Sequence, residues 1–390
     1  MQVKHTVLLT SLVGASTAQM CSAIPDSFTF AGGSSIKLPD PFLFINGSKV
    51  LTKADWDCRQ NEIGALFQRY ELGPKPAVDS VTATLASNRL SVTVTAGGKS
   101  VSFAPSIRFP SGNGPFPAII ALGGSSIPVP TGVAVITYNN EEIAATDPRG
   151  RGNSYDLYGA THPAGGLIAW AWGVSRIVDA LEKLGTTTTR INPARLAVTG
   201  CSRNGKGAFV SGAFDSRIRL TTPQEAGSGG MGCWRIVGEM KKNGTGVEDA
   251  AQIITGDGWF ATEFSNYVND LAKLPFDHHM LAGLVAPRPL LVIENSGIDY
   301  LGPVSTFGCA TAARLVYEAL GQEDSMGFSQ VAHGSSHCQL PSSQNADLNA
   351  FQNKYLMDKT DVETGNIFKT DKTYNFDLAR WVDWTAPTLT

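Results

Sequence analysis

A serine stands where a short strand passes directly into a helix, within residues 198–208 (VTGCSRNGKGA). The β-branched residues before Ser202 favour a strand, and the small residues after it favour a closely packed helix start. A serine on such a turn projects its hydroxyl above the sheet, where the first N–H groups of the helix can meet a developing oxyanion. Asn204 replaces the second glycine of the G-x-S-x-G pattern, and Gly205 follows one residue later. A serine in a Gly-rich turn is more often structural, so catalysis by Ser202 requires a base and an acid elsewhere in the chain.

The pattern of apolar residues predicts an α/β fold. Alternating apolar residues over 78–109 predict antiparallel hairpin strands near one sheet edge. The other expected strands are 117–122, 133–137, 196–199, 218–221, 290–293 and 327–332, and the expected helices are 55–70, 167–184, 309–320 and 346–355. Their alternation predicts a three-layer αβα sandwich with a mostly parallel central sheet and antiparallel N-terminal strands. Residues 19–75 are otherwise expected to be irregular, and the tail from residue 358 to form loop and short turns.

Composition and the N-terminal residues indicate where the protein acts. The net charge of −3 and the scattered Lys and Arg residues argue against nucleic acid as a partner. Residues 1–18 combine Lys4, an apolar stretch and small residues, which predicts a secretion signal too short to span a membrane. We therefore expect a secreted, extracellular protein that acts as a monomer and whose residues 19–390 form one α/β domain. Asn46 and Asn243 begin glycosylation sequons.

Six cysteines form an even set in a chain expected to be secreted: Cys21, Cys58, Cys201, Cys233, Cys309 and Cys338. Such a set predicts three disulfides, although six cysteines allow 15 connectivities. The chain has no C-x-x-C pair and no metal-like spacing of cysteine with histidine. Disulfides are therefore favoured over zinc, and no metal is expected.

The general base is expected among the histidines that follow the last of the predicted parallel strands, because the α/β-hydrolase chain order is serine, acid, histidine. His333 and His337 occupy that place. Cys201 directly precedes Ser202 and Cys338 directly follows His337, so a bond between these cysteines would hold nucleophile and base together. We therefore predict His337 as the base and His333 as a loop or supporting residue.

Two acidic residues compete for the third catalytic role. Glu225 lies after the strand that follows the nucleophile helix, and Asp299, with Glu294 nearby, lies after the next strand. The later position is commoner among α/β-hydrolases, yet residue chemistry alone leaves the two equal. Arg203 beside the serine could supply charge and donors to the oxyanion, and Lys206 one helical turn later could reach a substrate oxygen. Either cation could instead anchor the helix to an acidic side chain.

Several long segments resemble one family. Residues 200–208 resemble the nucleophile motif of the glucuronoyl esterases, carbohydrate esterase family 15. The segments 155–159 (YDLYG), 169–176 (AWAWGVSR), 223–225 (PQE), 274–279 (LPFDHH), 284–288 (LVAPR) and 337–338 (HC) resemble others in the family's order. The resemblance covers essentially the whole chain after residue 18, and it implies that residues 19–390 form one α/β-hydrolase catalytic domain. Because it assigns every cysteine to that domain, no carbohydrate-binding module is expected.

This resemblance implies a cofactor-free serine esterase that cleaves the ester between 4-O-methyl-D-glucuronic acid of glucuronoxylan and lignin alcohols. It places nucleophile, base and acid at Ser202, His337 and Glu225, the oxyanion arginine at Arg203 and a sugar contact at Lys206. It also implies the disulfides Cys21–Cys58, Cys201–Cys338 and Cys233–Cys309. The partners it implies are glucuronoxylan and lignin–carbohydrate esters.

The chain departs from the family at three sugar-contacting positions. Glu248 stands where the family usually has glutamine, Gly256 where it has glutamate, and Tyr300 where it has tryptophan. A carboxylate in place of an amide loses donors and gains charge, and glycine contacts no hydroxyl. These changes keep two alternatives open: an esterase for acetyl or feruloyl groups of plant polysaccharide, and a non-catalytic carbohydrate-binding relative.

Overall fold

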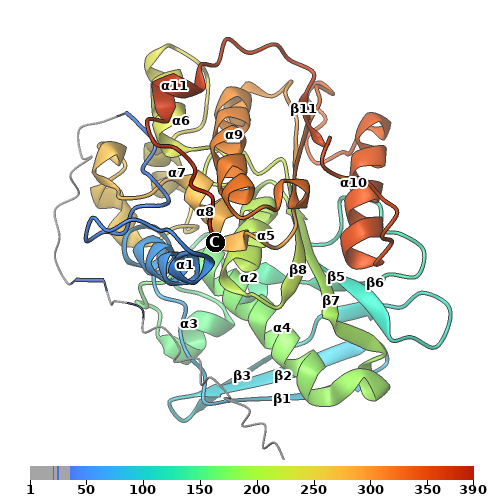
Figure 1. Ribbon diagram of the computed structural model, residues 1–390. Coiled ribbons are helices and arrows are strands. Elements are labelled where there is room, and N and C mark those ends of the chain that lie inside the picture. The colour runs from blue at the N-terminus through green and yellow to red at the C-terminus, as the bar shows by residue number, and fades with distance from the viewer. Residues whose placement is uncertain (1–20, 22–23, 26–35) are drawn as a thin grey trace, which may run out of the picture.

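The computed structural model describes residues 21, 24–25 and 36–390 (Figure 1). The expected secretion signal at residues 1–18 lies outside these residues. The described chain forms one sheet of 11 strands in the order β1-β2-β4-β6-β5-β7-β8-β9-β10-β11, with β3 paired to β2. The strands are β1 (Ser80–Ala86), β2 (Arg89–Ala96), β3 (Lys99–Phe103), β4 (Ser106–Arg108), β5 (Phe116–Leu122), β6 (Ala134–Tyr138), β7 (Ile191–Cys201), β8 (Ile218–Gln224), β9 (Leu290–Glu294), β10 (Met326–Gln330) and β11 (Phe368–Thr370).

The sheet changes character along its width. The pairs β1–β2, β2–β3, β2–β4 and β4–β6 are antiparallel. Every pair from β6 through β5, β7, β8, β9 and β10 to β11 is parallel. The predicted fold class is confirmed, with the antiparallel N-terminal strands at one edge. Because the parallel strands point the same way, the loops after β7, β8, β9 and β10 meet at one edge of the molecule.

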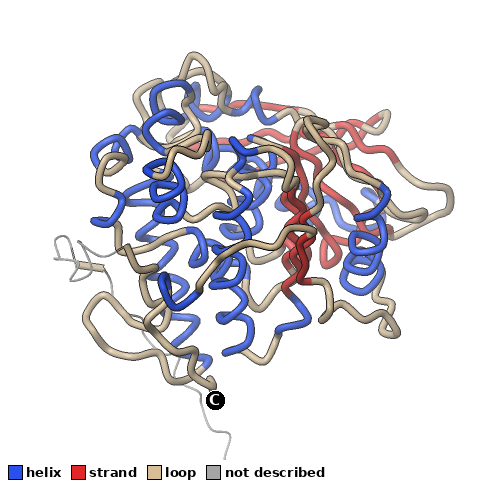
Figure 2. Tube along the Cα trace, turned by 90° about the horizontal axis from the view of Figure 1, so that it is seen from above, coloured by secondary structure: helices blue, strands red, loops and turns tan. Residues whose placement is uncertain are grey.

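Helices cover both faces of this sheet, as Figure 2 shows. The α-helices are α1 (Lys53–Phe67), α2 (Asn140–Ile143), α3 (Asn153–Tyr158), α4 (Gly166–Thr189), α5 (Arg203–Phe214), α6 (Trp234–Lys242), α7 (Ala250–Gly256), α8 (His278–Val285), α9 (Pro303–Ala319), α10 (Asn345–Phe351) and α11 (Leu378–Trp381). Short 3-10 turns are η2 (Thr262–Asn266), η3 (Leu271–Lys273), η4 (Asp299–Leu301), η5 (Glu323–Ser325) and η6 (Ser342–Gln344), and π turns are η1 (Gln68–Leu72) and η7 (Gln352–Leu356). Figure 1 places α10 across the sheet from α4, α5, α8 and α9.

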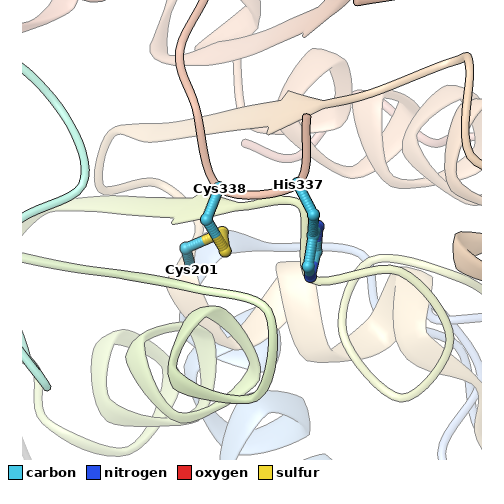
Figure 3. A group of neighbouring side chains, drawn as sticks. All are labelled: Cys201, His337 and Cys338. Carbon is cyan, nitrogen blue, oxygen red and sulfur yellow. A yellow bond between two sulfur atoms is a disulfide. The ribbon is translucent and has the colours of Figure 1, made fainter. Parts of the chain in front are cut away.

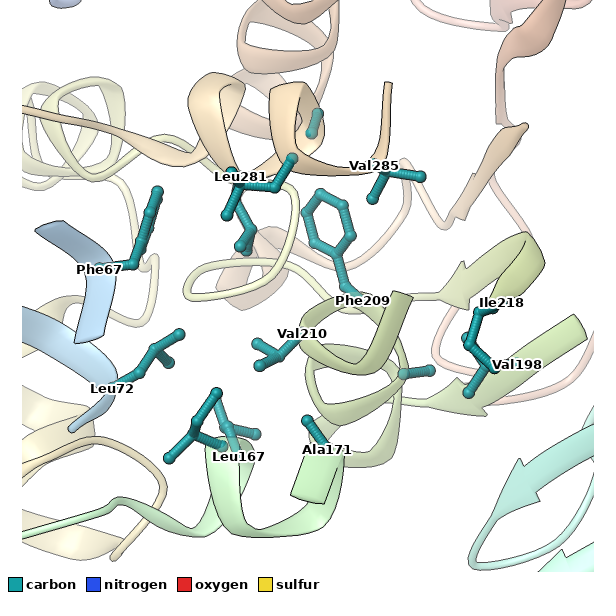
Figure 4. Close-up of a cluster of buried hydrophobic side chains, with 14 of the residues drawn as sticks. Phe67, Leu72, Leu167, Ala171, Val198, Phe209, Val210, Ile218, Leu281 and Val285 are labelled. Carbon is teal, nitrogen blue, oxygen red and sulfur yellow. The ribbon is translucent and has the colours of Figure 1, made fainter. Parts of the chain in front are cut away.

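The two faces of the sheet carry separate hydrophobic cores, because successive strand residues point to opposite sides. In β7, Leu196 and Val198 pack into the core beneath α4, α5 and α8, whereas Ala197 faces the smaller core under α10. Figure 4 shows the larger core, in which Phe209 and Val210 of α5 lie between the sheet and neighbouring helices. Helix α5, which begins directly after Ser202, is thus packed on several sides.

Local signals account for most element boundaries. Helix α1 begins at Lys53 rather than 55 because Thr52 and Asp55 form a capping box, in which the Asp55 N–H donates to Thr52 Oγ1 at 3.0 Å and the Thr52 N–H to Asp55 Oδ2 at 2.9 Å. The predicted helix 309–320 begins earlier, at Pro303, which is the first helical residue of α9. The helix expected over 167–184 extends over 166–189, with a break at Gly185.

The expectation for the C-terminal tail is wrong in one respect. Residues Phe368–Thr370 form the edge strand β11, which pairs in parallel with β10, and Leu378–Trp381 form α11. A three-residue strand is too short for an alternating pattern, so its pairing depends on the exposed edge of β10. The tail ends beside α1, where the Lys53 N–H donates to the Thr390 carbonyl at 3.1 Å. Within residues 21, 24–25 and 36–390, no helix has the length and apolar character of a membrane span.

Candidate active site

The turn between β7 and α5 holds Ser202 in a conformation that few residues adopt. Ser202 has φ 58° and ψ −126°, and its side chain makes no capping hydrogen bond to α5. A Cβ on Gly200 would lie 2.4 Å from the Asn204 carbonyl oxygen, and one on Gly205 would lie 2.6 Å from the Gln224 carbonyl oxygen. The turn therefore needs glycine at 200 and 205, which explains why the second glycine comes one residue later than in G-x-S-x-G.

Asn204 has a contact of its own at the position where the pattern expects glycine. Its Oδ1 accepts a hydrogen bond from Asn140 Nδ2 at 2.9 Å, which ties the first turn of α5 to α2. The Lys206 N–H donates to the Ser202 carbonyl at 3.0 Å, and the Ser202 N–H donates to the Gln224 carbonyl at 3.0 Å. Ser202 thus lies at the N-terminus of a helix, where backbone N–H groups favour negative charge.

A disulfide joins this turn to the loop after β10. Cys201 at the end of β7 bonds to Cys338, 137 residues later. Figure 3 shows the imidazole of His337 beside this bond, on the same side of the loop. The other bonds are Cys21–Cys58 and Cys233–Cys309, so the three pairs are those that the family resemblance implies.

Cys201, His337 and Cys338 also form a group with potential ligand atoms within 4.8 Å of one another. Both sulfurs are committed to the disulfide and are therefore not available as thiolate ligands. A metal site of this composition does not fit the oxidised pair.

Glu225 lies directly after β8 and connects to the His337 loop. Its side chain is fully buried and its φ is 44°. Oε2 accepts hydrogen bonds from His337 Nδ1 at 2.7 Å and from the Cys338 N–H at 3.0 Å. Oε1 lies 3.2 Å from His333 Nε2. Glu225 thus contacts His337 through Nδ1 and not through Nε2. A carboxylate that orients a catalytic base has this arrangement.

The other candidate acid is not brought to His337. Asp299 begins η4 and is exposed. Glu294, at the end of β9, is buried, and its Oε1 accepts the Gly227 N–H at 3.3 Å. Burial, together with the negative charge of Glu225, raises the pKa of Glu294 to about 8. Glu225 is therefore the carboxylate in contact with the candidate base, and Glu294 is a second buried acid that interacts with it.

The two cations of α5 have different surroundings. Arg203 is half exposed, and its Nε lies 3.7 Å from Glu141 Oε1. Lys206 is 2% exposed, and its Nζ lies 4.9 Å from the centroid of the Trp259 ring. Burial lowers the pKa of Lys206, while the charges of Glu248, Glu294 and Asp257 oppose the shift. The ammonium group is thus held in a site with acidic neighbours and an aromatic wall.

Glu248 and Tyr300 lie side by side near His337. The Glu248 N–H donates to the Tyr300 carbonyl at 3.0 Å. The Tyr300 ring meets the His337 ring edge-on, with the centroids 5.9 Å apart, and Tyr300 is 45% exposed. Burial raises the pKa of Glu248, and the charge of Lys206 opposes this shift. Tyr300 thus forms an exposed edge beside the candidate base, and the half-buried Glu248 lies next to Tyr300.

Comparison with known proteins identifies the family. The family model described as glucuronyl esterase, fungi, matches residues 92–321. A 4-O-methyl-glucuronoyl methylesterase of Podospora anserina is 55% identical over 364 residues, which cover 90% of this chain and 75% of that protein. The chain belongs to the glucuronoyl esterase family. The corresponding enzyme of Thermothelomyces thermophilus is 51% identical over 91% of this chain and 90% of its own.

Solved structures of glucuronoyl esterases have the same fold. The Sporotrichum thermophile enzyme matches with a TM-score of 0.91 and 50% identity, over 95% of this chain and 100% of that one. The catalytic domain from Hypocrea jecorina matches with a TM-score of 0.89 and 49% identity, over 94% and 100% of the two chains. A serine-to-alanine mutant of the Sporotrichum thermophile glucuronoyl esterase has been solved with methyl 4-O-methyl-β-D-glucopyranuronate, at 50% identity to this chain and a TM-score of 0.90.

Of the positions at which the chain departs from the family pattern, Gly256 and Tyr300 are exposed and Glu248 is half buried. A Cβ on Gly256 would meet no atom within 4 Å, so this position is open. Burial raises the pKa of the neighbouring Asp257, and the charges of Arg203 and Lys206 oppose this shift.

Both predicted glycosylation sites, Asn46 and Asn243, are exposed.

Proposed function

We propose that this chain is a serine esterase that hydrolyses esters of 4-O-methyl-D-glucuronic acid, and that its natural substrates are the esters joining glucuronoxylan to lignin alcohols. The observation that carries the proposal is the contact of His337 Nδ1 with the buried Glu225, on a loop that a disulfide ties to the residue before Ser202. Relatives that share about half of their residues with this chain are named 4-O-methyl-glucuronoyl methylesterases.

The proposed reaction proceeds through an acyl-enzyme. Ser202 Oγ attacks the ester carbonyl while His337 Nε2 takes its proton, and Glu225 stabilises the imidazolium that forms. Arg203 and the N–H groups at the start of α5 stabilise the tetrahedral oxyanion. His337 returns the proton to the departing alcohol, and water then repeats the sequence to release the uronic acid. Lys206, Glu248 and Tyr300 border the acyl side of this site and contact the sugar.

The decisive experiment compares substrates and variants in parallel. We expect hydrolysis of the methyl and benzyl esters of glucuronate and of 4-O-methyl-glucuronate, with little turnover of the galacturonate esters. Ser202→Ala should lower kcat by at least 10³-fold, whereas Ser216→Ala, which changes an exposed serine after the same helix, should leave kcat unchanged. Turnover of acetylated or feruloylated xylan alone would overturn the substrate, and full activity of Ser202→Ala would overturn the mechanism.

We propose further that residues 1–18 direct secretion, that residues 19–390 form the catalytic domain, and that the protein is an extracellular monomer. Three disulfides among the described residues suit an oxidising compartment. N-terminal sequencing of protein recovered from the culture medium should begin near residue 19, and light scattering should give the mass of one chain. Glycopeptide mapping would test Asn46 and Asn243 as attachment sites.

A further inference from the structure

Two imidazoles share the buried carboxylate of Glu225. His337 Nδ1 contacts Oε2, and His333 Nε2 lies 3.2 Å from Oε1. The His333 side chain is 10% exposed. Its backbone N–H donates to Asn295 Oδ1 at 3.3 Å, and Asn295 Nδ2 donates to the Gly334 carbonyl at 3.1 Å. His333 is thus held by the loop after β9, and its ring is fixed against Glu225.

Both ring nitrogens of His333 face oxygen atoms that only accept hydrogen bonds. Nε2 faces the Glu225 carboxylate, and Nδ1 lies 3.1 Å from the Val331 carbonyl oxygen. A neutral imidazole carries one N–H and one lone pair, so one of these contacts would set a nitrogen lone pair against an oxygen lone pair. An imidazolium carries a proton on both nitrogens and satisfies both contacts.

We propose that His333 is a positively charged positioning residue, which holds the ionised Glu225 through Oε1 while His337 contacts Oε2. The inference rests on the proposed roles of Glu225 and His337. Removing a positive charge that shares the carboxylate should change the pH dependence of the activity, because a nearby charge alters the cost of protonating a base.

Several other titratable groups lie near this loop. Burial and the charge of Glu225 raise the pKa of Glu294 to about 8, so this acid is neutral under acidic conditions. Asp371 accepts the Ala332 N–H at 2.8 Å and is exposed to solvent, which screens it. Lys206 interacts with the charges of Glu248 and Glu294. Burial and the charges of Glu225 and Glu248 raise the pKa of Tyr300, which faces His337, so Tyr300 is neutral in this pH range. Because His333 and His337 share Glu225, we expect removal of the His333 charge to affect His337 through that carboxylate.

The test separates charge from hydrogen bonding. His333→Gln and His333→Asn replace the imidazolium with a neutral amide donor, and His333→Ala removes both charge and donor. His162→Gln, at a half-buried histidine between α3 and α4, is the matched control. In the amide variants we expect the acidic limb of the kcat/KM profile to move about one pH unit higher, with the activity at alkaline pH within about threefold of wild type. The control variant should keep the wild-type profile.

A second measurement does not depend on activity. Nitrogen-15 NMR of protein labelled at histidine, with the His333 signals assigned by their absence in His333→Asn, should show both ring nitrogens protonated at about pH 6. An unprotonated nitrogen at that pH, or an equal loss of activity at all pH values in the amide variants, would overturn the inference. Failure of the wild-type protein to hydrolyse any uronate ester would instead refute the proposed function, and the NMR result would still report the charge of His333.

Discussion

The Cys201–Cys338 bond gives a quantitative prediction that links stability to activity. The double variant Cys201→Ala/Cys338→Ala opens a cross-link between residues 137 apart. In the chain-entropy model, a closed loop of this length stabilises the native state by about 5 kcal/mol, because the bond restricts the unfolded chain. We expect the free energy of unfolding, measured by urea denaturation, to fall by about this amount.

The same variant should lose activity beyond its loss of stability. The bond fixes the His337 loop to the end of β7. Without it, His337 and Cys338 keep their hydrogen bonds to Glu225, and the earlier part of the loop keeps its bonds to Asn295. A displacement of about 1 Å between nucleophile and base can cost roughly 10²-fold in rate. We therefore expect kcat/KM to fall between about 10-fold and 100-fold under conditions in which the variant is fully folded.

The matched control is Cys21→Ala/Cys58→Ala. These residues are 37 apart, and the same relation assigns their bond about 4 kcal/mol. Cys58 lies in α1, away from the parallel-strand loops, so we expect this variant to lose stability while keeping wild-type kcat/KM. Wild-type activity in the Cys201/Cys338 variant, or an equal loss of activity in both double variants, would refute the view that this bond positions the base.

Three further substitutions test other parts of the site. Arg203→Gln removes a charged donor from the proposed oxyanion site and should lower kcat by about 10²–10³-fold with a smaller change in KM, as steady-state kinetics would show. Gly205→Ala would set a Cβ 2.6 Å from the Gln224 carbonyl oxygen and should destabilise the fold by about 1–3 kcal/mol in thermal unfolding. Glu294→Gln removes an acid whose pKa burial raises from 4.5 to about 8. Since the folded state holds this proton more tightly than the unfolded state, wild-type stability should fall as pH rises from about 5 to 8. The variant should lack that decline. The difference between the unfolding free energies of the wild type and the variant should therefore change by about 4 kcal/mol over this pH range.

The parallel strands and their helices were predictable because their signals are local. Strands such as β5 and β9 are continuous apolar runs, which are typical of strands buried on both faces. The edge strand β11 was missed because three residues carry no period, and its pairing depends on β10, 40 residues earlier in the chain. The early start of α9 was missed for a different reason. Proline usually indicates the end of a helix, yet Pro303 is well accommodated because it lies in the first helical turn.

Residue chemistry alone does not distinguish Glu225 from Asp299 as the carboxylate that orients the base. Both acids follow predicted strands within short polar segments, and only the family resemblance separated them. In the structure Glu225 points inward at φ 44° and lies against His337, whereas Asp299 is exposed at the start of η4. The direction in which a loop carboxylate points depends on how neighbouring loops pack, which no short stretch of sequence encodes.

The βα alternation, the tight turn that presents Ser202 and the set of cysteines can all be recognised in the sequence, because each follows from backbone preferences and side-chain chemistry within a few neighbouring residues. The contacts of Glu225 with both His337 and His333, and the burial of Glu294, come instead from the packing of segments far apart in the chain. Glu225 and His337 are 112 residues apart. Their contact exists because β8, β9 and β10 lie side by side in the sheet and deliver their loops to one edge, and that order is set by the packing of the whole domain.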